Sequence, residues 1–128
     1  MSKGEVLVAN ILIGLGIPFE TQKTFDGLRD KKPLRFDFYF KYRRVTFFGK
    51  QKIIQYVIEF DGLQHQKPVK FFGGTDKFKD IQRRDKMKDL YCKKEGIHLL
   101  RVSTLDHDKL RVQIIKFILN SGAKLKKL

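Results

Sequence analysis

Two carboxylates, an amide and an imidazole lie close together in segment 59–65 of this chain. Glu59 and Asp61 end an apolar run, and Gln64 and His65 follow a turn glycine. Side chains alternate between the two faces of an extended chain, so Glu59 and Asp61 should point the same way. Two carboxylates held together repel each other unless a shared proton or a bound cation neutralises them. We therefore expect a hard divalent cation at this strand end.

Asp37 is the candidate third ligand. The run 34–42 alternates, with Phe36, Phe38 and Phe40 expected on one face and Arg35, Asp37 and Tyr39 on the other. A turn near residues 48–50 should return the chain as an antiparallel partner, which would bring Asp37 beside Glu59 and Asp61. Mg²⁺ or Mn²⁺ bound by these three carboxylates could polarise a phosphodiester and help to generate a nucleophilic hydroxide. The alternative is a surface ladder in which Arg35 or nearby lysines pair with the acids.

Three other side chains could assist this chemistry. Glu5, on a predicted first helix, is a possible fourth carboxylate. Gln64 could orient water, and His65 could act as a general base, stabilise a leaving oxygen or ligate the ion. A lone loop histidine is more often a solvated surface residue, so both interpretations of His65 stay open.

Lys88 is a further candidate, on a predicted second helix. Helical spacing puts Asp85 and Lys88 on a side of this helix that is otherwise apolar. The two residues either form a structural ion pair or contribute to the site from above the sheet. A lysine contributed from above the sheet could stabilise charge on a nucleophile or on a phosphate.

The charge balance indicates a polyanionic partner. The 128 residues include 28 Lys and Arg against 14 Asp and Glu, a net charge of +14, and the sequence pI is about 10.0. DNA is the expected partner, with phosphate contacts from six basic residues: Arg43, Arg44, Lys67, Lys70, Arg83 and Arg84. Phe71 and Phe72 could stack on bases, although packing onto the core is the simpler interpretation.

Two other classes of protein are disfavoured. No apolar run approaches the ~18 residues of a membrane span and no signal peptide is visible, so we expect an intracellular protein without a membrane partner. Cys92 is the single cysteine, which excludes an intramolecular disulfide and a cysteine-based zinc site.

The expected elements make an α/β fold. Helices are predicted at 3–15, 75–95 and 106–120, and strands at 19–25, 34–42, 52–61 and 97–102, with loops at 26–33 and 62–74. A helix between the third and fourth strands favours a parallel crossover, and hence a mixed sheet flanked by helices. We expect a single domain over 1–122 and a basic tail over 123–128.

Five motifs in this order resemble the PD-(D/E)XK nuclease superfamily. They are Ser2-x-x-Glu5, Leu34-Arg35-Phe36-Asp37-Phe38, Ile58-Glu59-Phe60-Asp61-Gly62-x-Gln64-His65, Asp85-x-x-Lys88 and Gly96-Ile97-x-Leu99-Leu100-Arg101-Val102. The most similar branch is the very-short-patch-repair-like one, which includes the EDxHD homing endonucleases. The resemblance implies a restriction-endonuclease-like sheet of about four strands and a metal-dependent endonuclease, with Asp37 as the central metal ligand.

The chain departs from the family pattern at two places. Pro33 lies four residues before Asp37 rather than beside it, and Asp61 replaces the usual lysine of the second acidic motif. Which residue activates the nucleophile therefore stays open. The leading expectation is a Mg²⁺-dependent or Mn²⁺-dependent DNA endonuclease, and a double-strand break would favour a homodimer. The alternatives are a degenerate module that only binds nucleic acid and a structure-selective junction resolvase.

Overall fold

The computed structural model describes residues 1–62 and 74–121 of the chain. The elements, in chain order, are α1 (Lys3–Gly14), β1 (Glu20–Asp30), β2 (Lys32–Val45), β3 (Gln51–Phe60), α2 (Gly74–Glu95), β4 (His98–Val102) and α3 (His107–Asn120). The strands form one open sheet in the order β1-β2-β3-β4. β1, β2 and β3 pair antiparallel, whereas β4 lies parallel to β3. The predicted α/β class, with a four-stranded mixed sheet and flanking helices, is confirmed.

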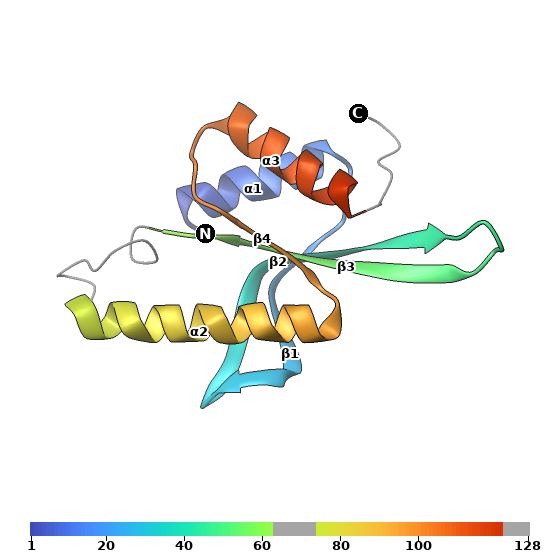
Figure 1. The fold of residues 1–128 in the computed structure, drawn as a ribbon. Coiled ribbons are helices and arrows are strands. Elements are labelled where there is room, and N and C mark those ends of the chain that lie inside the picture. The colour runs from blue at the N-terminus through green and yellow to red at the C-terminus, as the bar shows by residue number, and fades with distance from the viewer. Residues whose placement is uncertain (63–73, 122–128) are drawn as a thin grey trace.

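The sheet separates two apolar layers (Figure 1). Helices α1 and α3 cover one face, where the buried core includes Leu12, Phe38, Tyr56, Ile58 and Ile114. Helix α2 covers the other face, where a smaller core forms around Leu28, Leu34, Phe36, Val57 and Cys92. Residues 56–60 of β3 therefore alternate between the two layers as the sequence predicts.

Helices α1 and α3 both begin where the sequence predicts. The Ser2 hydroxyl accepts a hydrogen bond from the Glu5 N–H at 3.2 Å, and the Asp106 carboxylate accepts one from the Lys109 N–H at 3.1 Å. Each bond satisfies a backbone donor that has no partner inside its helix. After α1, Gly16 takes a φ of +71°, the left-handed conformation in which a helix commonly ends.

Residues 26–33 form strand rather than the predicted loop. β1 continues to Asp30, and β2 begins at Lys32 after a tight reversal at Lys31, whose φ is +63°. Leu28 is 3% exposed and packs in the layer under α2, which anchors this charged segment to the core. The sequence pattern missed the strand because one buried leucine among charged residues gives little periodicity.

The prediction that Phe36, Phe38 and Phe40 share one face is wrong. Phe36 packs under α2, whereas Phe38 and Phe40 pack under α1 and α3. The change of face occurs between Phe36 and Phe38, opposite Gln22 of β1, whose φ is +53°. Asp37 thus lies where the side chains of β2 change from the face of the sheet under α2 to the face under α1 and α3.

Within the described residues, no helix is both long and apolar enough to cross a membrane.

Candidate active site

A buried ion pair lies at the carboxyl end of β3. Lys88 Nζ, on α2, donates to Glu59 Oε1 at 2.8 Å, and the two side chains are 12% and 5% exposed. The same ammonium lies 5.3 Å from the centroid of the Phe36 ring. The structure therefore shows Lys88 turned toward the sheet and bonded to Glu59 of β3.

The environment of Glu59 opposes its ionisation. Burial raises the pKa of Glu59 above its usual value, and the nearby charge of Asp37 raises it further, while Lys88 and Arg101 lower it. The 2.8 Å bond to an ammonium shows how the charged form is accommodated despite that burial. The pKa of Glu59 is thus raised by burial despite its ion pair, and carboxyl groups perturbed in this way are concentrated at functional sites.

Asp37 reaches the same strand end from β2. The antiparallel ladder ends at the pair Phe38 and Ile58, and the Phe60 N–H donates to Asp37 Oδ2 at 2.8 Å instead of to a backbone carbonyl. This side-chain bond fixes Asp37 next to Glu59, as the predicted pairing of these strands requires. The ladder alternative is not what the structure shows for Glu59, which is buried and bonded to a helix lysine rather than to Arg35.

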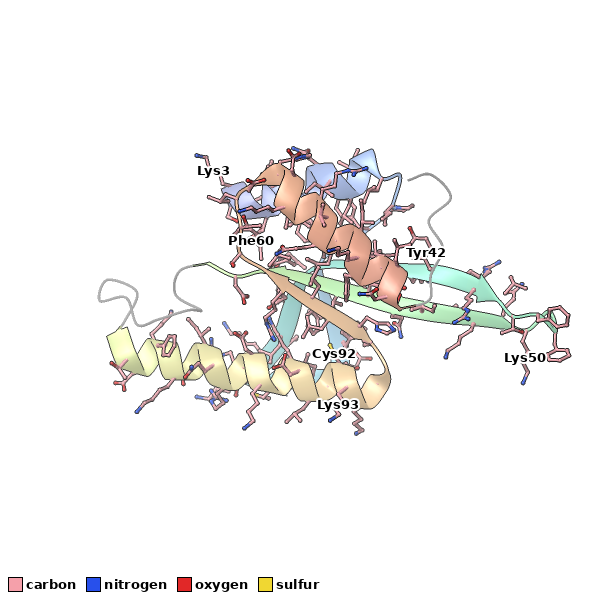
Figure 2. All side chains as sticks on the ribbon, turned by 45° about the horizontal axis from the view of Figure 1, so that its top comes forward. Lys3, Tyr42, Lys50, Phe60, Cys92 and Lys93 are labelled. Atoms are coloured by element: carbon pink, nitrogen blue, oxygen red, sulfur yellow. The ribbon has the colours of Figure 1, made fainter. Side chains whose placement is uncertain are left out.

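The first turn of α1 lies against Phe60, the last residue of β3. A side chain at Gly4 would meet the Phe60 ring, because an added Cβ would lie 2.1 Å from its Cε1 atom. Figure 2 shows Lys3 and Phe60 close together at this end of the sheet. Glu5 is half-buried in the same turn. The helix can approach so closely only because Gly4 lacks a side chain.

Asp61 and Arg101 complete the described surroundings. The Asp61 N–H donates to the Val102 carbonyl at 2.7 Å, which continues the β3 and β4 pairing past the end of the strand. Arg101 pairs in register with Glu59, bonds the Asp89 carboxylate and donates from Nη2 to the Asp85 carbonyl at 3.1 Å. The sequence analysis gave Arg101 no role. An arginine within a short buried strand was the available signal.

The donor set suits a hard cation held by few protein ligands. Asp37 and Glu59 each have one carboxylate oxygen in a described hydrogen bond, which leaves the second oxygen of each for an ion. Mg²⁺ is often bound by one or two carboxylates with water and substrate phosphate completing its shell. Across residues 1–62 and 74–121, no cluster of three or more His, Cys, Asp or Glu could hold a metal. Of the three predicted carboxylate ligands, the structure shows Asp37 and Glu59 beside each other at the end of β3.

The predicted residues fall into three groups. Asp37, Glu59 and Lys88 come together, and the start of α1 packs against the neighbouring Phe60. Gln64, His65, Lys67, Lys70, Phe71 and Phe72 lie outside the described residues, as does the predicted tail 123–128.

The predicted phosphate-binding arginines are placed elsewhere. Arg43 and Arg44 lie in the distal β2–β3 hairpin, paired with Ile53 and Lys52. Arg83 and Arg84 lie on α2 and both bond the Asp30 carboxylate, at 2.8 and 3.4 Å. None of the four contacts the carboxylates of the site in the structure.

No similarity to a known protein was found for this chain. Comparisons with protein-family models, curated proteins and solved structures gave no match to the chain. The chemistry of the side chains at the end of β3 must therefore support any function assigned to them.

Proposed function

We propose that this protein is a metal-dependent DNA endonuclease built on a restriction-endonuclease-like sheet. The observation that supports this most is the pairing of Lys88 with the buried Glu59, beside Asp37 on the adjacent strand. An acid pair on neighbouring strands with a lysine directed at it matches what the superfamily resemblance implies. The net charge of +14 suits a DNA substrate.

Asp37 and Glu59 are the residues that would hold Mg²⁺ or Mn²⁺. When bound, such an ion polarises the scissile phosphate and makes water a stronger nucleophile at neutral pH. The Phe60 N–H fixes one oxygen of Asp37, so the carboxylate is oriented before an ion arrives. Asp61 stays a proposed third ligand, and Glu5 a proposed helper from α1.

Lys88 takes the role of the missing lysine in this proposal. Its ammonium is held by Glu59 and by the face of the Phe36 ring, so it is oriented without being exposed. From there it would donate to the attacking water or to a phosphate oxygen and stabilise the negative charge that develops. A lysine supplied by α2 removes the need for one at position 61.

Plasmid nicking tests the proposal. Supercoiled DNA is incubated with Mg²⁺ or Mn²⁺ and with the wild type, Asp37→Asn, Glu59→Gln or Asp108→Asn. The last is a matched control, since Asp108 is 97% exposed on α3. We expect nicking by the wild type and the control only. Equal nicking by all four proteins would identify a contaminant and overturn the proposal.

Two alternative functions would give different results with the same DNA substrates. Tight DNA binding without cleavage under either metal would favour a degenerate binding module. Cleavage restricted to branched DNA would favour a junction resolvase. A homodimer stays a proposal, and would be tested by whether linear double-strand products rise with protein concentration.

A further inference from the structure

Two phenylalanines are fully exposed at the tip of the β2–β3 hairpin. Phe47 is 96% exposed and Phe48 is 91% exposed, so neither ring contributes to the core. The rings contact each other edge to face, with centroids 5.4 Å apart and planes at 88°. Adjacent exposed aromatic side chains form an apolar patch of the kind that contact sites for other molecules often contain.

The turn that holds these rings is closed by hydrogen bonds. The Thr46 N–H donates to the Lys50 carbonyl at 2.8 Å, and the Lys50 N–H donates to the Thr46 hydroxyl at 3.1 Å. Gly49 takes a φ of +78°, and its N–H donates to the Thr46 carbonyl at 2.9 Å. Phe47 and Phe48 are therefore presented on a defined turn.

The hairpin is also uniformly basic. From Phe38 to Ile58 the sequence contains no acidic residue, while its cations are Lys41, Arg43, Arg44, Lys50 and Lys52. Arg43 pairs with Ile53 and Arg44 pairs with Lys52, so successive arginines point to opposite faces of the ribbon. Figure 1 shows the ribbon extending beyond the three described helices. Figure 2 shows Lys50 at its far end.

We propose that the β2–β3 hairpin is a nucleic-acid-binding arm, whose cations hold backbone phosphates while Phe47 and Phe48 stack on bases that have left the duplex stack. A two-stranded ribbon fits the major groove, which has phosphates on both sides, and this arm has cations on both faces. Aromatic stacking on exposed bases supplies affinity without reading sequence. An anionic membrane would meet the tip alone, leaving the cations along both faces unused.

DNA is chosen as the ligand because of the proposed function. The arm and the proposed catalytic site lie at opposite ends of β3, so the two can be tested separately. Binding is measured in EDTA, which removes the metal ion and so prevents cleavage. A wild type that binds DNA but does not nick it would then reject the catalytic proposal alone. A wild type that nicks DNA but does not bind it through the hairpin would reject the arm alone.

The test compares a duplex containing unpaired bulged bases with the matching perfect duplex, by fluorescence anisotropy on the whole chain. The double variant Phe47→Ala/Phe48→Ala should lose roughly five- to hundredfold affinity for the bulged duplex. It should lose much less for the perfect duplex. Phe47→Trp/Phe48→Trp should retain binding, since the aromatic planes remain. Leu90→Ala is the matched control, because Leu90 is a 60% exposed apolar residue on α2.

Charge is tested separately with Arg43→Ala/Arg44→Ala. This variant should weaken binding to both duplexes and reduce the slope of log affinity against log salt by roughly two. The fluorescence of a 2-aminopurine placed in the bulge should change when the wild type binds. It should not change when the Phe47→Ala/Phe48→Ala variant is added.

Several outcomes overturn the proposal. Unchanged affinity of the Phe47→Ala/Phe48→Ala variant for the bulged duplex would do so, as would a wild type that does not prefer the bulge. If the Phe47→Ala/Phe48→Ala variant lost binding to phosphatidylserine vesicles but kept DNA binding, the tip would be assigned to membranes. If ultracentrifugation showed that the wild type is a dimer and this variant a monomer that still binds DNA, the tip would be assigned to contact with a second copy of the chain. Circular dichroism should show all variants folded, because both rings lie outside the core.

Discussion

Replacing Lys88 with methionine should destabilise the protein strongly and in a pH-dependent way. Methionine keeps most of the aliphatic stem and removes only the ammonium, so Glu59 loses its partner while remaining 4% exposed. Removing one partner of a buried ion pair costs about 3–5 kcal/mol. Because the Lys88 side chain is itself only 12% exposed, little solvent screening reduces this value, and we expect a loss of about 3 kcal/mol at neutral pH.

The pH dependence follows from the direction of the Glu59 shift. Burial raises the pKa of Glu59 above its value in the unfolded chain, so the folded state binds this proton more tightly. Its contribution to stability is therefore full below the unfolded pKa and is lost as the pH rises through the folded pKa. Without Lys88 the folded pKa rises further. The cost of Lys88→Met should therefore be smaller at pH 5 than at pH 8, because a lower pH favours the protonated form of the buried carboxyl group.

Urea unfolding followed by circular dichroism at both pH values measures this difference. Lys86→Met is the matched control, because Lys86 is exposed on the same helix. Adding Glu59→Gln to Lys88→Met should recover much of the lost stability, since no charge then remains buried. An equal loss at pH 5 and pH 8, or an equal loss for Lys86→Met, would refute the account of this ion pair.

Three further predictions concern packing, the thiol and the arm. Gly4→Ala should lose about 1–3 kcal/mol in urea unfolding, because its Cβ would lie 2.1 Å from the Phe60 ring, whereas Gly14→Ala, with nothing within 4 Å, should gain up to about 1 kcal/mol. Cys92 is 2% exposed and its burial raises the thiol pKa to about 11, so a thiol reagent at pH 8 should label it only on unfolding; rapid labelling of the native protein would contradict this. If both proposals hold, cleavage of a singly bulged duplex should fall about one helical turn from the bulge, since the 10 residues of β3 span roughly 33 Å. Incision mapped on a sequencing gel at positions unrelated to the bulge would contradict it.

Regular hydrophobic patterns predicted most of the fold. The α1 start at Ser2, the antiparallel pairing of β2 with β3 and the parallel addition of β4 all follow from local patterns and chain connectivity. The pairing also predicted that Asp37 would lie near Glu59. These features depend on interactions between neighbours in sequence or in register, which a single chain reveals.

Two features depend on contacts that the sequence pattern does not show. Gln22 takes a left-handed φ that its residue type does not predict, and the strands change face there, so strict alternation misplaced Phe36. The partner of Lys88 was equally undetermined, because Asp85 was the nearer acid along the helix. The choice of Glu59 depends on how α2 lies across the sheet, which is a tertiary property.

The change of face at Asp37 has a consequence for how activity and folding are related. Phe60 packs with the α1 and α3 layer, whereas Glu59, its neighbour, bonds to a lysine of the α2 layer. Each layer thus anchors one side of the same strand end, and Asp37 is bonded to Phe60 across it. Loosening either layer would alter the spacing of the two carboxylates before the sheet itself came apart. Cavities made far away, in either core, would then reduce the proposed cleavage activity at temperatures where the protein is still folded.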